Sequence, residues 1–408
     1  MEKLEIGNLY SMIQKLSNFG CRWLDSDGEN NARQFILDKF EEFGLENISR
    51  EYFLCHNYIP KEYGLKVLSP TKLDLVCKPL EYSGNSEVEG ELVFLGEFKE
   101  DDANTISNLN IDLEGKICLI VSDTPAFFIP ALAERGAIGI IVASEAPDNL
   151  IRMLAAKSYP PNFDDPSKWK VELPGVSISK RDLYRLLSFT SSGKVVVRIE
   201  HRWESKISET CNILGVVEGD TDESIVVGAH YDSQMKTIGV WDNLTGLTTL
   251  IELARIFSKV KVHRRIIFVA FGAEEIGLWG SAFFVDKRRS ELRENCIAMF
   301  CLDALSSAFP AEKSLWSEGK IREFIIQRAR EYGTPIDNVK EPILSYSDYY
   351  PFVVEGIPVA MLWEYPPINP YYHTEKDLLK YVDISRLHSM GELNRKIIGE
   401  VNSVGYRF

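Results

Sequence analysis

The sequence predicts an α/β fold: a mostly parallel, mixed sheet sandwiched by helices, with an inserted β-rich α+β module. First, continuous apolar strands alternate with helical patterns after about Cys211, which is typical of a sheet covered on both faces. Second, the pattern changes between residues 58 and 204, where short β-rich pieces replace this alternation. Third, 408 residues are more than one hydrophobic core usually serves, which favours two domains.

Two helices and a strand open the chain. Helical patterns cover residues 7–19 and 29–43, and a strand is expected over 48–53. In the second helix, apolar residues recur at helical spacing: Ala32, Ile36, Phe40 and Phe43. Gly44 is suited to end this helix, because glycine adopts the left-handed conformation without steric cost.

The stretch from 58 to 204 reads as a separate module. It has one short helical piece at 130–135, a polar stretch at 158–170, and several expected strands: 65–68, 73–76, 91–95, 117–121, 137–142 and 194–201. None of its side-chain combinations suggests chemistry. The expected domains are therefore a discontinuous one, 1–57 with 205–408, and an insertion, 58–204.

The remainder alternates strand and helix. Strands are expected at 212–217, 225–228, 265–271, 297–302 and 357–363. Helices are expected at 247–257, 279–289 and 321–332. This alternation indicates parallel strands joined by helical crossovers.

Composition excludes several classes of protein. The net charge is −14, from 60 acidic and 46 basic residues without a prominent basic cluster, so a nucleic-acid partner is not expected. The N-terminus lacks the apolar core of a signal peptide, and no apolar run is long enough to span a membrane. The seven cysteines are scattered without a CxxC pair. These observations favour a soluble, cytoplasmic protein.

Histidines and carboxylates follow the ends of four expected strands. They are His230, Glu274 with Glu275, Asp303 and His373, and Asp242 joins them from the loop after the first strand. Ligands bind outside the carboxyl ends of strands in such sheets, so these side chains are expected to meet. They would repel and desolvate one another unless cations balanced them. Mixed nitrogen and oxygen ligation suits Zn²⁺, with Co²⁺ or Mn²⁺ as alternatives, and five ligands suit two metals that share a carboxylate.

Each of these residues also has a structural explanation on its own. A histidine at a strand end is commonly structural, the paired glutamates could begin a helix, and Asp303 could cap one. However, two of the six histidines stand where the acids gather, which favours the metal interpretation. The other four are expected to be structural: His56, His201, His263 and His388.

Several motifs resemble the M28 family of zinc aminopeptidases. They are AHYDS, WDN (241–243), FVAFGAEEIGLWGS (268–281), LDA (302–304), GIPVAML and YYHTEKD, and they occur in the family's order. The opening segment FGCRWLDSDGENNARQFILDKFEEFG is similar as well, so the resemblance covers about two thirds of the chain. In the insertion, DLEGKICLIV and ALAERGAIGIIVAS resemble the protease-associated (PA) domain.

The resemblance implies a zinc-exopeptidase-like fold and two Zn²⁺ per chain. One metal would be held by His230, Asp242 and Asp303, and the other by Asp242, Glu275 and His373, with Asp242 bridging. Because neighbours on an extended segment point in opposite directions, Glu274 and Glu275 are not expected to bind the same ion.

The resemblance also implies roles around the metals. Asp232 would hydrogen-bond the ring of His230 and fix its tautomer. Glu274 would be the general base, and Tyr372 would donate to the developing oxyanion. The sequence departs from the family pattern in SYSDYYPF (345–352), where Tyr349 stands in place of a histidine that many relatives have.

The expected activity is hydrolysis of the N-terminal peptide bond, with a metal-bridging water activated by Glu274. The expected partners are peptides with a free N-terminus, and a homo-oligomer is the general expectation for a soluble protein. Three alternatives stay open: a carboxypeptidase or dipeptidase with the same dinuclear site, a glutaminyl cyclase with a single zinc, and a binding homologue without catalysis.

Overall fold

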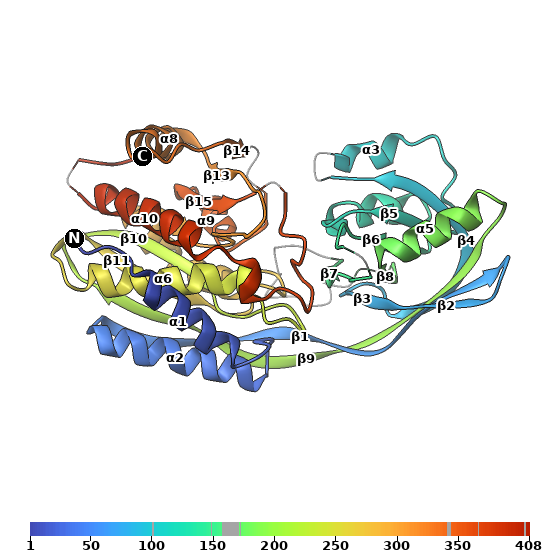
Figure 1. Cartoon of the computed structure of the whole chain (residues 1–408), viewed down its shortest axis with the longest axis horizontal. Helices are drawn as coiled ribbons and strands as arrows, with labels where there is room; N and C mark the ends of the chain where they lie inside the picture. The colour runs from blue at the N-terminus through green and yellow to red at the C-terminus, as the bar shows by residue number, and fades with distance from the viewer. Residues whose placement is uncertain are drawn as a thin grey trace. The chain divides into compact units, whose positions relative to one another are not determined.

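The computed structural model describes all residues except 100–101, 148, 157–170, 172, 341–343, 366 and 404, so the polar stretch at 158–170 lies outside the described residues. The chain forms two compact units (Figure 1): Met1–Cys55 with Ser208–Phe408, and His56–Ile207. The ranges expected from the sequence were 1–57 with 205–408 and 58–204. The assignment of the insertion to the PA class stays a prediction.

A mixed sheet forms the centre of the first unit. Its strand order is β14 (Asn338–Lys340), β13 (Lys313–Ser317), β15 (Val359–Glu364), β12 (Cys296–Cys301), β10 (Gly219–His230), β11 (Val262–Phe271) and β9 (Val196–Val217). The central strand β10 is parallel to β11 and β12, and β12 is parallel to β15. Strands β9 and β13 run antiparallel to their neighbours β11 and β15. The predicted fold class, a mostly parallel but mixed α/β sheet, is confirmed.

Helices cover this sheet. They are α1 (Ile6–Ser17), α2 (Asp27–Phe43), α6 (Thr245–Phe257), α7 (Trp279–Asn295), α8 (Gly319–Glu331), α9 (Tyr350–Val354) and α10 (Ile384–Val401). Helix α6 packs on β10 and β11 and is itself covered by α1, α2 and α10, so all its residues are buried. All residues of β10 from Ser224 to His230 are buried too, which explains their continuous apolar pattern. Among the described helices, none combines the length and apolar character needed to cross a bilayer.

Helix α2 shows how local sequence sets an element's limits. The Ser26 side chain accepts a hydrogen bond from the backbone N–H of Glu29 and caps the helix. Gly44 ends it with φ of 72°, the left-handed conformation predicted for this glycine.

The strands of the second unit follow the order β9, β4 (Ser86–Glu97), β5 (Lys116–Val121), β6 (Gly139–Ala143), β8 (Gly175–Ile178), β3 (Cys77–Glu81) and β7 (Leu154–Ala155). Strand β2 (Leu73–Leu75) pairs with the long strand β1 (Glu46–Ser69). The unit's helices are α3 (Ala103–Asn108), α4 (Ile129–Glu134) and α5 (Lys180–Thr190). Two hydrophobic clusters lie within the unit, one containing Leu119 and Ile141, the other Ile120 and Ile140. Because adjacent residues of β5 and β6 enter different clusters, the two faces of this sheet carry separate cores.

A buried histidine network lies in the second unit. His201 Nε2 is 2.7 Å from the Tyr58 hydroxyl, and His201 Nδ1 is 2.9 Å from Ser83 Oγ and 3.0 Å from the Gly84 carbonyl oxygen. Burial lowers the pKa of His201 to about 4, although the contact with Gly84 acts in the opposite direction. These contacts give His201 a structural role.

We expect the second unit to lose stability as the pH falls from about 6.5 to about 4. In that range the unfolded chain binds a proton at His201 that the folded chain excludes, so unfolding becomes easier. Since one pKa unit corresponds to about 1.4 kcal/mol, the loss is at most ~3 kcal/mol. His201→Gln should flatten this dependence. The loss can be measured by urea unfolding of the wild type and His201→Gln at about pH 7 and about pH 4.5. Hydrogen exchange in peptides from 175–207 then shows whether the change lies in the second unit. If the free energy of unfolding changed equally with pH in the wild type and in His201→Gln, the role assigned to His201 would be contradicted.

Candidate active site

The histidines and carboxylates at the strand ends lie together in the first unit. His230 ends β10, Asp303 follows β12, and the two glutamates follow β11. His230 Nε2 is 3.1 Å from Asp242 Oδ1 and 3.6 Å from Asp303 Oδ1. His373 Nε2 is 3.1 Å from Asp242 Oδ2 and 3.0 Å from Glu275 Oε2. The Asp242 carboxylate therefore presents one oxygen to each imidazole.

The spacing of these atoms suits metal ligation. Zinc binds nitrogen and oxygen at about 2.0–2.1 Å, which places neighbouring atoms of a tetrahedral site about 3.3–3.4 Å apart. The four distances above, 3.0 to 3.6 Å, bracket that value. Among the described residues, the buried atoms Asp303 Oδ1 and Glu275 Oε1 find no hydrogen-bond donor. Buried acceptors without donors are costly, and a cation would satisfy them.

The potential ligand atoms form two groups that differ in which glutamate they include. His230, Glu274 and Asp303 offer atoms within 4.8 Å of one another, and so do His230, Asp242 and Glu275. The two glutamates thus contribute to different groups. Their position differs from the extended segment expected from the sequence. They stand at a turn, in which the backbone N–H groups of Gly277 and Leu278 both donate to the Glu274 carbonyl. The expectation of an extended segment is therefore wrong.

The electrostatics of the cluster reflect crowded charge in a buried place. Burial raises the pKa of Glu274 well above its usual value, and burial together with Asp242 raises that of Glu275 to about 7. Burial alone would lower the pKa of His373, but Glu275 and Asp242 outweigh it and raise the value to about 10. Burial works against ionisation of Asp242, yet His230 and His373 hold its pKa below the usual range. The carboxylates therefore depend on positive charge nearby.

Asp232 joins two parts of the cluster. Its Oδ1 is 3.4 Å from His230 Nδ1, the ring nitrogen opposite the one that faces Asp242. Its two oxygens also accept the backbone N–H groups of Glu274, at 3.2 Å, and Glu275, at 3.1 Å. One buried carboxylate thus lies beside the imidazole and holds the turn that carries both glutamates.

Three residues at the cluster have left-handed backbone conformations. Ala273 has φ of 58°, Ala304 has φ of 52°, and His373 has φ of 55°. Such conformations cost non-glycine residues roughly 1–2 kcal/mol each. They stand next to Glu274, next to Asp303 and at His373 itself. Backbone strain of this kind gathers at functional sites, where the surrounding structure offsets it.

The sequence analysis missed two residues that hold Asp242 and Asp303 in place, Asp377 and Ser347. Asp377 Oδ1 accepts the backbone N–H of Trp241 at 2.8 Å, and its Oδ2 accepts that of Asp242 at 3.1 Å. Ser347 Oγ donates to Asp303 Oδ2 at 2.8 Å. Asp377 closes the motif YYHTEKD, so its place beside His373 was the available signal.

Arg22 was missed as well. Its fully buried guanidinium donates to the carbonyl oxygens of Tyr231 at 2.6 Å, Ile238 at 2.5 Å and Gly239 at 3.1 Å. These contacts hold the loop between His230 and Asp242 in place. The only sequence signal was its position within the opening segment FGCRWLDSDG.

The two tyrosines singled out from the sequence have different surroundings. Tyr372 stacks on His373, with 3.7 Å between ring centroids, and meets Trp241 edge-on at 5.6 Å. Burial raises its pKa well above the usual value, and nearby carboxylates led by Asp242 add to this. Tyr349 is fully buried, donates to the Leu344 carbonyl oxygen at 2.5 Å and packs edge-on against Trp316. Tyr349 thus anchors its own loop.

The chain was compared with known proteins. The family model of Peptidase family M28 matches residues 212–398. Aminopeptidase YwaD of Bacillus subtilis is 28% identical over 295 residues, which are 69% of this chain and 61% of YwaD. Leucine aminopeptidase 2 of Arthroderma otae is 30% identical over 295 residues, covering 70% of this chain and 56% of the relative. The match thus spans somewhat under two thirds of each relative.

Solved structures share the fold. An aminopeptidase from Aneurinibacillus sp. strain AM-1 aligns with a TM-score of 0.74 at 24% identity, covering 99% of this chain and 95% of that one. A zinc aminopeptidase from Bacillus subtilis aligns with a TM-score of 0.72 at 22% identity, covering 98% and 96%. The similarity in fold therefore includes the inserted unit. Residues 212–398, which contain the cluster from His230 to His373, thus match peptidase family M28.

Proposed function

We propose that the protein is a dinuclear zinc aminopeptidase that hydrolyses the N-terminal peptide bond of peptides. The observation that carries this proposal is the Asp242 carboxylate, which turns one oxygen to His230 and the other to His373. One ion would be held by His230, Asp242 and Asp303, and the second by Asp242, Glu275 and His373. The matched relatives are named aminopeptidases, and one structural neighbour is a zinc aminopeptidase, which supports the same activity here.

Zinc at such a site supplies Lewis acidity and lowers the pKa of water. The chain's own residues do the rest. Glu274 takes a proton from the attacking water and passes it to the leaving amine. Tyr372 donates to the oxyanion that develops on the substrate carbonyl. Asp232 holds His230 in one tautomer by its contact with Nδ1.

The acidic surroundings suit a substrate with a free α-amine. Glu274, Glu275 and Asp303 are carboxylates, and the amine of an unblocked peptide is positively charged near neutral pH. Pairing of this ammonium with a carboxylate in a buried site would disfavour a substrate that lacks the charge. We therefore infer an exopeptidase restricted to the N-terminal residue.

We expect aminoacyl p-nitroanilides to be hydrolysed and their N-acetylated forms to react at least about 100-fold more slowly. The assay compares free and N-acetylated aminoacyl p-nitroanilides, and it includes peptides blocked at the C-terminus. The metal content of the purified protein is measured in parallel. Loss of activity on blocking the C-terminus instead would indicate a carboxypeptidase or dipeptidase. A metal content near one per chain, with ring formation from N-terminal glutamine, would indicate a glutaminyl cyclase. Bound metal without any hydrolysis would indicate a binding protein.

A further inference from the structure

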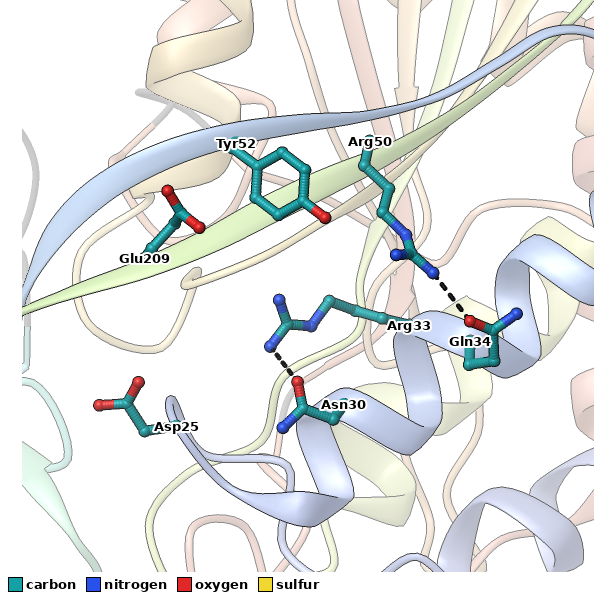
Figure 2. A pocket seen from close by; sticks show the side chains of 7 residues that line it. All are labelled: Asp25, Asn30, Arg33, Gln34, Arg50, Tyr52 and Glu209. Atoms are coloured by element: carbon teal, nitrogen blue, oxygen red, sulfur yellow. Dashed lines mark hydrogen bonds between the residues drawn. The ribbon is translucent and has the colours of Figure 1, made fainter.

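A second polar pocket lies in the first unit, outside the metal cluster. It has a volume of about 510 Å³ and is bounded by α2, β1 and the part of β9 that belongs to this unit (Figure 2). Its lining residues are Asp25, Asn30, Arg33, Gln34, Arg50, Tyr52 and Glu209. None of them is a candidate metal ligand or a residue used by the proposed reaction. Its volume is within the usual range of small-molecule sites.

The charges of this pocket are separated. Figure 2 shows the carboxylates of Asp25 and Glu209 on the left and the guanidinium groups of Arg33 and Arg50 toward the centre and right. Each arginine is held by a side-chain amide oxygen. Arg33 Nη2 donates to Asn30 Oδ1 at 2.7 Å, and Arg50 Nη2 donates to Gln34 Oε1 at 2.8 Å. The pocket therefore has a positive side and a negative side.

We propose that this pocket binds a zwitterion, namely a free amino acid or a short unblocked peptide. A guanidinium has the fork geometry that carboxylates accept, so the ligand carboxylate lies at Arg33 and Arg50. The ligand ammonium lies at Asp25 and Glu209. Tyr52 is 49% exposed and offers its ring to the ligand side chain. A simple anion would meet the two carboxylates and a simple cation the two arginines, so the arrangement favours a ligand that carries both charges.

This ligand class coincides with the products of the proposed reaction. That link rests on the proposed function, but the binding itself does not, because it follows from the lining charges alone. The pocket residues most suitable for substitution are Arg50 and Glu209, which are exposed. Arg33 is less suitable because it pairs with the buried Glu29 at 3.1 Å.

The hydrogen bonds of Glu29 explain why Arg33 is not substituted. Thr210 Oγ1 donates to Glu29 Oε1 at 2.6 Å and lies 3.1 Å from the hydroxyl of Tyr231, the residue between His230 and Asp232. Changing Arg33 would therefore disturb buried groups beside the metal cluster as well as the pocket. Substitutions at Arg50 and Glu209 avoid this.

The test is calorimetric titration of the full chain with leucine, with N-acetylleucine, which lacks the ammonium, and with isopentylamine, which lacks the carboxylate. Arg50→Gln and Glu209→Gln should each weaken leucine binding about two- to fivefold, as expected for exposed charge pairs, and the double variant should weaken it further. Arg185→Gln, an exposed arginine of the second unit, is the matched control and should leave binding unchanged. The two blocked ligands should bind the wild type more weakly than leucine.

Two results would overturn the proposal. Equal leucine affinity in the wild type and the double variant would show that the pocket is not the binding site. Equal affinity for leucine and N-acetylleucine would show a site for simple anions. Hydrolysis of an aminoacyl p-nitroanilide by the double variant should match the wild type, since neither residue contacts the metal cluster. A protein without peptidase activity that still shows the binding difference would contradict the proposed function but not the pocket.

Discussion

Replacing Glu274 with Gln is expected to lower kcat by about 10²–10⁴-fold, the usual contribution of a general acid–base residue. Glutamine has the same shape but cannot accept the proton of the attacking water. The metal content should be retained, because the proposed ligands are other side chains and the backbone N–H of residue 274 can still donate to Asp232. Steady-state kinetics with leucine p-nitroanilide, combined with metal analysis of the same preparation, measures both effects.

The neighbouring glutamate provides the matched control. Glu275 Oε2 contacts His373 Nε2 at 3.0 Å, so Glu275→Gln should weaken metal binding as well as activity. The two variants differ by one position and have the same side-chain chemistry, but their metal contents should differ. A Glu274→Gln enzyme that keeps both its zinc and its activity would show that another group accepts the proton.

Replacing Asp242 with Ala is expected to abolish activity and to remove metal from both sites. Its two carboxylate oxygens face different imidazoles, so no other residue of the cluster can replace this contact. Metal that binds only the folded protein stabilises it by about 4 kcal/mol at a free concentration 1,000 times its Kd. The wild type should therefore melt at a lower temperature after chelation, whereas Asp242→Ala should melt at the same temperature with and without chelator.

Metal analysis and thermal unfolding check this prediction together. Asp286→Ala is the control, because Asp286 is an exposed carboxylate on α7, away from the cluster, and its removal should leave zinc content and the chelator response unchanged. An Asp242→Ala protein with the zinc content of the wild type would contradict the bridging role. Activity that survives chelation in the wild type would contradict the metal mechanism as a whole.

Much of the first unit could be predicted from sequence because its strands are buried on both faces. The continuous apolar runs of β10, β11, β12 and β15 are short and end sharply. Polar site residues stand at the end of β10 and shortly after the ends of β11 and β12. Helix α10 was missed for the opposite reason. Its buried face includes Glu392 and Arg395, which satisfy each other at 2.8 Å, so its apolar period is interrupted by charges that look exposed in sequence.

Sequence by itself determined which residues stand at the strand ends, since the apolar runs limit the strands and the histidines and acids follow them. Tertiary structure alone decided which oxygen faces which nitrogen. His230 contacts both Asp242 and Asp303, and His373 contacts Asp242, although these groups are spread from residue 230 to residue 373; the strand order β15-β12-β10-β11 brings them together. It also decided the turn at Glu274 and the backbone contacts of Asp232, Asp377 and Arg22. Those contacts join side chains to backbone groups of distant segments, and no local pattern specifies such pairs.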